Sequence, residues 1–576
     1  MNFILKIDMK RHKIIKIVLA IVIFLVNGIY LKINYLTNYD EFTSLAMIAK
    51  LGGKDWSSLV AISDFHGYGH LLPIALIFQF INSGTIFYKC CMIWMLFLRI
   101  VMAEVIYILT EKCWKVDYRW SFFISIVCSL GTLAAEHQSP ISVLTEVPLC
   151  FCTLIIVLTV WAGIEFNRNY FLFATFIAAF SMTIHARSVI IQIALFLSLI
   201  VLLCLDKKFK KKIDKKSMVF VIASFFIFYF FIRFVNKGLV NYLYISNETL
   251  SNSYETVVSL RVPYLFHVLV HSDQLKIAID IFFANIVSYV FYSFGLIGII
   301  FTIQMKYLFF ILKRGYSNVE EKVLTWAVLF GTLCWIGMCT VIAFTSVGAI
   351  QEGNYAWYTY IRYSLPFVCI MVSTSMVIVC KKIVKIRVGW IFFIEVLACK
   401  YFVLNIAAKL DQSGYGMKYS MFNSLFYPNL GTNATVYFSK FTMIIIMVCI
   451  VYYWISYKEK FYFIFAIYLI LSALIYIEVY KYHMERDIYS EAMCNKSVEL
   501  INELKADNNP CTIYVSGGIG YILWLQAAVP DISLQYVEDA RKAKFENSVL
   551  LTNDVTNYED LDFIVLDNNE YVIMYD

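Results

Sequence analysis

The chain has 576 residues, of which 61% are hydrophobic, 17% aromatic and only 15% charged, and its mean hydropathy is +0.71. A soluble globular domain of this size does not carry such a balance, so the composition excludes a water-soluble enzyme. It predicts an α-helical polytopic protein of the cell membrane, with the lipid bilayer as its surroundings and no nucleic-acid partner.

Hydrophobic segments of roughly 20 residues, the length that spans a bilayer, recur along the first 479 residues. A basic start runs into the first of them without a cleavage site, which indicates a retained signal anchor. The run Leu71–Ile81 is too short to span and predicts a re-entrant or interfacial helix. The sequence thus predicts about 13 spans, near residues 14–36, 88–110, 119–135, 147–164, 169–186, 188–205, 218–236, 285–312, 323–347, 362–380, 389–407, 437–456 and 461–479.

Positive charge predicts the orientation of these spans. With a cytoplasmic N-terminus, the basic segments 111–119, 206–216, 313–322 and 381–387 all fall on the cytoplasmic side, as the positive-inside bias requires. Polar residues then gather on the outer side, in a first outer loop (37–87), a second outer loop (135–146), a long loop (237–284) and the segment 348–363.

The composition changes at residue 480. Residues 480–576 contain 5 Lys and 2 Arg against 9 Asp and 8 Glu, a net charge of −10. A helix-like run is followed by short apolar runs bounded by turn residues, which predicts a small α/β domain on the outer side after the transmembrane domain 1–479. The glycines of "SGGIG" (Ser516–Gly520) are typical of a strand-to-helix turn, with a phosphate-binding loop as the alternative.

An acidic pair, Asp40 and Glu41, follows the first span. Adjacent residues of a helix point about 100° apart, so only one of the two can face a given ligand. A carboxylate at an outer cavity can accept the proton of an attacking hydroxyl. The alternative is a helix cap with a first-turn acid. We regard Asp40 and Glu41 as the catalytic candidates, with Asp40 preferred.

The stretch "FHGYGHLLP" places His66, Tyr68 and His70 before the short helix. The two histidines have the i, i+4 spacing of metal ligands on a helix, but the intervening glycines disfavour a helix and a third ligand is absent. We therefore expect a flexible loop whose His and Tyr side chains bind substrate, and we assign no metal.

Further polar residues on the outer side are candidates for substrate binding. Glu136 and His137 begin the second outer loop and Glu146 ends it, where a helix-start acid is the alternative role.

Several basic residues and one tyrosine are expected on the same side. His185 and Arg187 lie between two spans with almost no loop, where Arg187 could pair with an acid or a phosphate. Arg261, Tyr360 and Arg362 complete the candidates, although Arg beside aromatic residues also snorkels at interfaces. An outward acid, outward cations and many aromatic residues together indicate a site for a lipid-linked anion.

The sequence resembles the GT-C superfamily of polytopic glycosyltransferases, in the branch of bacterial proteins related to protein O-mannosyltransferases and aminoarabinose transferases. The resemblance rests on four stretches: "NYDE", "FHGYGHLLP", "AEHQSPISVLTEVPL" and "IRYSLP". The resemblance implies that Asp40, with Glu41 beside it, is the base or the acid that orients the acceptor. It also implies inverting transfer from a polyprenyl-phosphate sugar donor, held by basic outer residues, to a glycan, glycolipid or protein acceptor of the cell envelope. Some members of the family use a divalent cation.

Two other classes of protein compete with this interpretation. A transporter or flippase of lipid-linked saccharides would also have many spans and a cationic cavity, but internal repeats are expected there and the sequence shows none. In a noncatalytic membrane protein, the outer acid would cap a helix and Arg187 would form a structural salt bridge.

Overall fold

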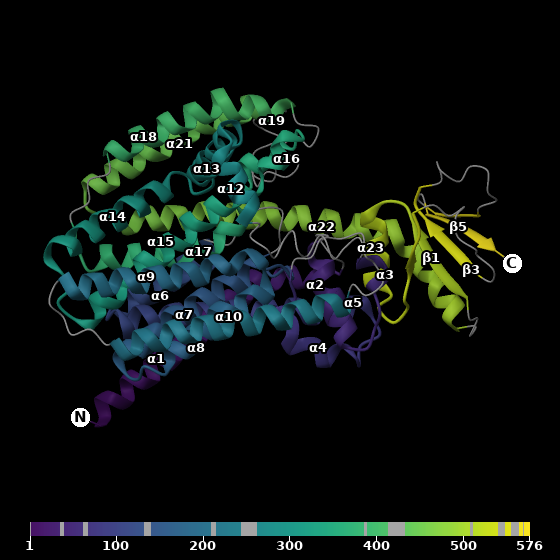
Figure 1. The fold of residues 1–576 in the computed structure, drawn as a ribbon, viewed down its shortest axis with the longest axis horizontal. Helices are drawn as coiled ribbons and strands as arrows, with labels where there is room; N and C mark the ends of the chain where they lie inside the picture. The colour runs from purple at the N-terminus through teal and green to yellow at the C-terminus, as the bar shows by residue number, and fades with distance from the viewer. Residues whose placement is uncertain are drawn as a thin grey trace.

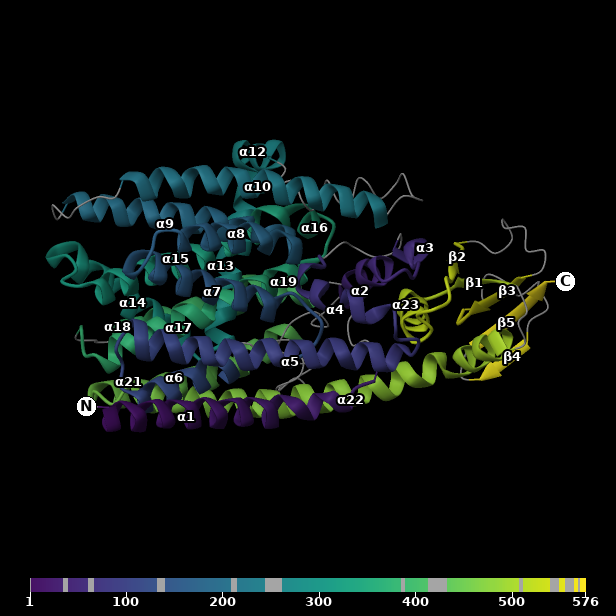
Figure 2. The same cartoon turned by 90° about the horizontal axis from the view of Figure 1, so that it is seen from below.

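The computed structural model describes residues 2–34, 40–60, 67–131, 140–208, 215–243, 262–384, 389–412, 433–506, 511–538, 548–554, 564–567 and 570–575. Within these ranges the chain forms a long bundle of helices with a small sheet at one end (Figure 1). The N-terminus lies at the opposite end of the long axis from the sheet (Figure 2). The fold is that of an α-helical polytopic membrane protein with a small α/β unit, as predicted.

Twelve helices in the described ranges are long and apolar enough to cross a membrane. Their main helices are α1 (Asn2–Gly28), α5 (Gly84–Ile108), α7 (Glu146–Glu165), α9 (Val189–Lys208), α10 (Lys215–Leu243), α13 (Ser272–Tyr292), α14 (Leu296–Arg314), α15 (Val319–Thr345), α17 (Leu365–Cys380), α18 (Gly389–Phe402), α21 (Ala434–Tyr457) and α22 (Tyr462–Ala506). The spans of α17 and α18 reach their full length only with adjoining helical turns, over Tyr355–Cys380 and Gly389–Gln412. Two shorter apolar helices, α6 (Tyr118–Gly131) and α8 (Tyr170–Ile184), pack among them and coincide with predicted spans. Turns of π-helix extend α5 (η3, Leu109–Cys113) and α18 (η7, Val403–Ala407), and α19 (Ala408–Gln412) follows η7.

One predicted span is wrong. The segment 285–312 is not a single helix, because the chain breaks between α13 and α14. Phe294 and Gly295 have φ angles of +51° and +80°, which a right-handed helix cannot accommodate. The long outer loop predicted over 237–284 is also wrong in its described parts, since α10 extends to Leu243 and α12 (Val262–Val270) and α13 cover the rest.

The first outer loop folds into short helices at the sheet end of the bundle (Figure 2). They are α2 (Asp40–Leu51), α3 (Ser57–Val60), η2 (Gly69–Leu71) and α4 (Leu72–Phe78). The predicted short helix over Leu71–Ile81 is thus present, begun by a proline in the first turn of α4. Short turns complete this end: η1 (Ile29–Lys32) after α1, η4 (Ala186–Ser188) after α8, and α16 (Val347–Gln351), η5 (Tyr355–Thr359) and η6 (Arg362–Ser364) between α15 and α17.

The C-terminal unit contains β1 (Thr512–Ser516), α23 (Ile519–Ala528), β2 (Gln535–Tyr536), β3 (Ser548–Thr552), β4 (Ile564–Asp567) and β5 (Glu570–Tyr575). The sheet has the order β2-β1-β3-β5-β4, with β1 parallel to β2 and β3 and with β5 antiparallel to β3 and β4. The "SGGIG" segment is the β1–α23 turn, in which Gly517 has φ +106° and the Gly518 amide donates to Asn553 Oδ1 at 2.8 Å.

This α/β unit packs directly on the first outer loop. Lys54 forms an ion pair with Asp531, and Trp56 Nε1 donates to the Pro530 carbonyl at 3.0 Å. The amide of Tyr536 in β2 donates to Ser58 Oγ in α3 at 2.9 Å. The unit is therefore joined to the bundle twice, through α22 and through the loop that carries Asp40.

Candidate functional site

The centre of the candidate site is the guanidinium of Arg362. This residue opens η6, just before α17, and its side chain is 4% exposed. Its Nη1 donates to Asp40 Oδ2 and its Nε donates to Glu146 Oε1, while the Tyr360 hydroxyl lies 3.4 Å from Nη1. A planar fork of donors suits this simultaneous contact with two carboxylates.

Both carboxylates stand at the N-termini of helices. Asp40 is the first residue of α2 and Glu146 is the first residue of α7, where the helix dipole favours negative charge. Their side chains are 24% and 10% exposed, so Asp40 is the more accessible. Arg362 thus joins three segments that are far apart in the chain, and snorkelling does not account for this buried arginine.

A second arginine approaches the same region from η4. The Cζ of Arg187 lies 4.5 Å from the ring centroid of Tyr363 and 5.7 Å from that of Trp357. The Cζ of Arg362 lies 5.6 Å from the Tyr363 ring, so both cations contact one aromatic side chain. The imidazole of His185 accepts from the Arg187 amide at 3.0 Å and lies 4.6 Å from the Tyr363 ring.

The two arginines differ in their partners. Arg362 is compensated by two carboxylates. Arg187 has no acidic partner among the residues that the structure describes, and its Nη1 is buried there without a hydrogen-bond acceptor. A buried donor without an acceptor is costly, so this geometry favours the binding of an anion at Arg187.

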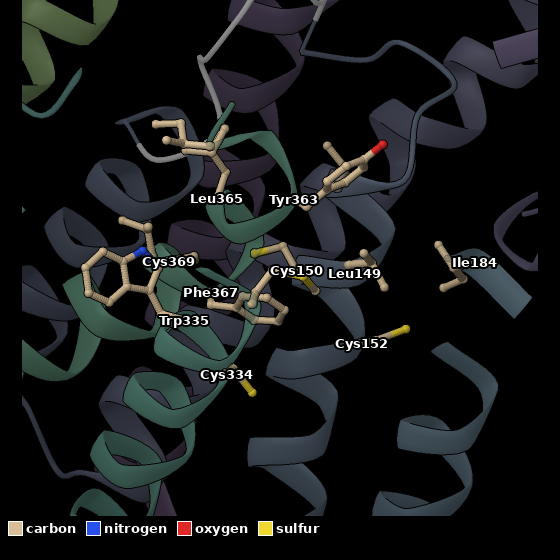
Figure 3. Close-up of a cluster of buried hydrophobic side chains, with 14 of the residues drawn as sticks. Leu149, Cys150, Cys152, Ile184, Cys334, Trp335, Tyr363, Leu365, Phe367 and Cys369 are labelled. Atoms are coloured by element: carbon tan, nitrogen blue, oxygen red, sulfur yellow. The ribbon is translucent and has the colours of Figure 1, made fainter. Parts of the chain in front are cut away.

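Apolar side chains lie below the ring of Tyr363. In Figure 3, Tyr363 sits above Phe367 of α17, with Leu149 of α7 and Ile184 of α8 beside it. These side chains and Tyr363 are all buried in one hydrophobic cluster. Tyr289 of α13 holds the neighbouring backbone, since its hydroxyl donates to the Ile361 carbonyl at 3.0 Å.

Glu41 points away from this site, as the 100° separation of adjacent helical residues predicts. It is completely buried, and its Oε2 accepts from the Tyr88 hydroxyl at 2.8 Å and from the Val143 amide at 2.9 Å. Its carboxylate therefore bridges α5 and the second outer loop, although Glu41 also lies in the first turn of α2.

The "GYG" stretch is a packed turn in its described part, and the expectation of a flexible loop is wrong there. A Cβ on Gly67 would lie 2.0 Å from the Ile184 carbonyl oxygen, and one on Gly69 would lie 1.7 Å from Thr183 Oγ1. The Tyr68 hydroxyl donates to Asn236 Oδ1 at 2.7 Å, so Tyr68 is held by α10. The glycines permit close contact with the chain just before His185.

His70 is buried beside the second outer loop. Its Nε2 lies 3.4 Å from the Val143 carbonyl oxygen, and Trp94 Nε1 donates to its backbone oxygen at 2.7 Å. Burial lowers the pKa of the His70 imidazole to about 4, while the bond to Val143 acts in the opposite direction. His70 is therefore neutral near pH 7.

The other candidates are His66, Glu136, His137 and Arg261, and they lie outside the described residues. Across the ranges that the structure does describe, no group of three or more His, Cys, Asp or Glu side chains could hold a metal ion.

Sequence reasoning missed the residues that organise the site. Trp357 and Tyr363 stack on the arginines, and Tyr88 and Val143 bind Glu41. The run "YAWYTYIRY" already signalled aromatic residues around Arg362. A backbone amide such as that of Val143 carries no signal in a sequence.

The fold and the site define a polytopic helical membrane protein with a charged, aromatic cluster at the end that adjoins the α/β unit. No family model and no curated protein matches the chain. Among solved structures, it is similar to ArnT from Cupriavidus metallidurans bound to undecaprenyl phosphate, at 9% identity over 97% of each chain, with a TM-score of 0.48.

It is also similar to the Archaeoglobus fulgidus oligosaccharyltransferase tethered with an acceptor peptide, at 11% identity over 92% of this chain and 64% of that one, with a TM-score of 0.42.

Proposed function

We propose that the protein is a membrane glycosyltransferase that moves a sugar, with inversion, from a polyprenyl-phosphate-linked donor to an acceptor outside the cytoplasm. The observation that carries the proposal is the unequal pairing of the two arginines that contact Tyr363. Arg362 is compensated by Asp40 and Glu146, whereas Arg187 has no acidic partner in the described part of the chain.

Arg187 is assigned to the donor phosphate. A guanidinium binds a phosphate through two parallel hydrogen bonds. The N–H groups on the buried Nη1 of Arg187 have no acceptor among the described residues, so they can donate to a phosphate oxygen. The surrounding rings of Trp357 and Tyr363 keep the guanidinium plane in place. As the bond between the sugar and the phosphate breaks, negative charge grows on the phosphate, and a nearby cation stabilises that charge.

Asp40 is assigned as the base. Of the three acids described near the site, it is the most exposed, at 24% of its side chain, against 10% for Glu146 and none for Glu41. The acceptor hydroxyl gives its proton to Asp40 while its oxygen forms a bond to C1 of the sugar, and the bond from C1 to the phosphate oxygen breaks. Attack from the face opposite the phosphate inverts C1 and releases polyprenyl phosphate.

The decisive test measures release of polyprenyl phosphate from a polyprenyl-phosphate sugar in membranes that contain the protein. The wild-type protein should turn over the donor, and Asp40→Asn should lower the rate about 100-fold or more because a base is lost. Asp55→Asn is the matched control, since Asp55 lies in the same outer loop and pairs with Lys50 at 2.9 Å. Normal turnover by a folded Asp40→Asn variant contradicts the assignment.

The same membranes separate a transferase from a flippase. A flippase would move the labelled lipid across the bilayer with the sugar still attached, so it would release no polyprenyl phosphate. Translocation of intact donor without cleavage would replace the proposed activity with transport.

The orientation belongs to the same proposal: the N-terminus is cytoplasmic, and residues 480–576 form an outer domain that faces the acceptor. Ser57→Cys should react with a membrane-impermeant thiol reagent in intact cells, and Lys207→Cys should not. Labelling of position 207 from outside would overturn this topology.

A further inference from the structure

Both peptide groups of Val143 are held by side chains of the first outer loop. The Val143 N–H donates to Glu41 Oε2 at 2.9 Å, and its carbonyl oxygen lies 3.4 Å from His70 Nε2. All three residues are buried, with exposed fractions of 0% for Val143 and Glu41 and 4% for His70. Val143 itself lies three residues before Glu146, in the segment that leads into α7.

The chemistry of the His70 contact fixes the form of its ring. A carbonyl oxygen only accepts, so Nε2 must carry the proton. The Nδ1 atom is buried without a partner among the described residues, which is the arrangement of a neutral ring with one N–H. Trp94 of α5 anchors the backbone of His70, and Tyr88 of α5 donates to Glu41. The two residues that hold Val143 are therefore both bonded to α5, His70 through its backbone and Glu41 through its side chain.

We propose that Glu41 and His70 are positioning residues of the transfer site, which act through Val143 on Glu146. This inference rests on the function proposed above. Asp40 and Glu41 share one turn of α2: the first contacts Arg362, and the second holds the segment that delivers Glu146 to the same guanidinium. Asp40 thus contacts Arg362 directly, and Glu41 helps to place Glu146, the second carboxylate that compensates Arg362.

The segment between Val143 and Glu146 can transmit this constraint because it has little freedom. Leu144 and Thr145 are buried, with exposed fractions of 3% and 2%. The carbonyl of Thr145 accepts from the Leu149 amide at 3.0 Å, which is the first helical bond of α7. A displacement of Val143 therefore moves the first turn of α7, and with it the carboxylate of Glu146.

The test combines amide hydrogen exchange over residues 141–147 with steady-state kinetics on the polyprenyl-phosphate sugar. Glu41→Gln keeps the size of the side chain but removes its charge. We expect exchange over this segment to accelerate about tenfold or more, with a similar fall in kcat and a donor KM within about threefold of wild type, since Arg187 is untouched.

His70→Phe is the second variant, because it removes the donor to Val143 without leaving a buried charge. It should accelerate exchange about threefold and lower kcat in proportion. Glu165→Gln is the matched control: it makes the same chemical change at the exposed far end of α7 and should alter neither quantity.

Unchanged exchange in Glu41→Gln and His70→Phe would show that these residues do not hold the segment. Faster exchange with wild-type kcat would show that the segment does not position the site. If the wild-type protein fails to turn over the donor, the proposed function fails, while the exchange experiment still decides whether Glu41 and His70 hold Val143.

Discussion

Arg362 and Asp40 form an ion pair between residues 322 positions apart in the chain. The pair joins the start of α2, in the first outer loop, to the turn before α17. Because Arg362 also contacts Glu146, one buried guanidinium fixes the relative positions of three helix starts. The acid proposed to act in catalysis is therefore held in place by a structural cation.

Removal of that cation should cost stability. In Arg362→Met, two largely buried carboxylates lose their counter-charge, and we expect the free energy of unfolding to fall by about 3 kcal/mol. SDS titration from a mild detergent measures this quantity. The triple variant Arg362→Met, Asp40→Asn, Glu146→Gln should recover most of the loss, because neither carboxylate is left without its counter-charge. A triple variant no more stable than Arg362→Met would mean that packing, and not charge, holds this contact.

Loss of Arg187 should weaken donor binding and leave the fold intact. Arg187→Gln removes the cation assigned to the phosphate, so the donor KM should rise about tenfold or more, while stability changes by less than about 1 kcal/mol because no described carboxylate depends on it. Arg233→Gln, on the exposed face of α10, is the control. Equal KM values in the two variants would remove Arg187 from the site.

Gly69 should not tolerate a side chain. A Cβ there would lie 1.7 Å from Thr183 Oγ1 and 2.7 Å from Thr183 Cβ, so Gly69→Ala forces η2 away from α8. We expect a loss of about 1 to 3 kcal/mol, the range for overpacking. Gly238→Ala in α10 has nothing within 4 Å and should be neutral or stabilising. Thermal unfolding of the two variants in the same detergent gives the comparison.

The buried imidazole of His70 should make the protein less stable in mild acid. Its pKa is about 4 in the folded protein, below the usual 6.5, so between these values the unfolded chain binds more protons. The free energy of unfolding should therefore fall as the pH drops from 6.5 to 5, by about 2 kcal/mol. His70→Phe cannot titrate, so the difference between its pH profile and that of the wild type isolates this contribution. Parallel profiles would exclude it.

Part of this architecture follows from hydrophobic length and charge alone. Most predicted spans coincide with helices because an apolar run of about 20 residues has few alternatives in lipid. The broken pair α13 and α14 escaped prediction because its joint is as apolar as the helices beside it. Gly295, with its positive φ, is the residue that marks the break.

The charged residues of the candidate site were predictable, but their pairing and the aromatic residues beside them were not. Asp40, Glu146 and Arg362 were all expected on the outer side, yet nothing local distinguishes which acid meets which arginine. Long-range pairing depends on how the helices pack, and a single sequence does not record this. For the same reason, the sequence left the role of Glu41 open until the Val143 amide was located.

Helix α22 runs without interruption for 45 residues, from Tyr462 to Ala506. At 1.5 Å per residue it is about 68 Å long, more than twice the thickness of a bilayer's hydrocarbon core. The helix therefore sets how far the sheet lies from the far end of the helical bundle (Figure 2). The ion pair between Lys54 and Asp531 fixes the sheet on its other side. If the proposed transferase function holds, we expect the distance between the sheet and Arg187 to limit the size of the acceptors that can reach the site.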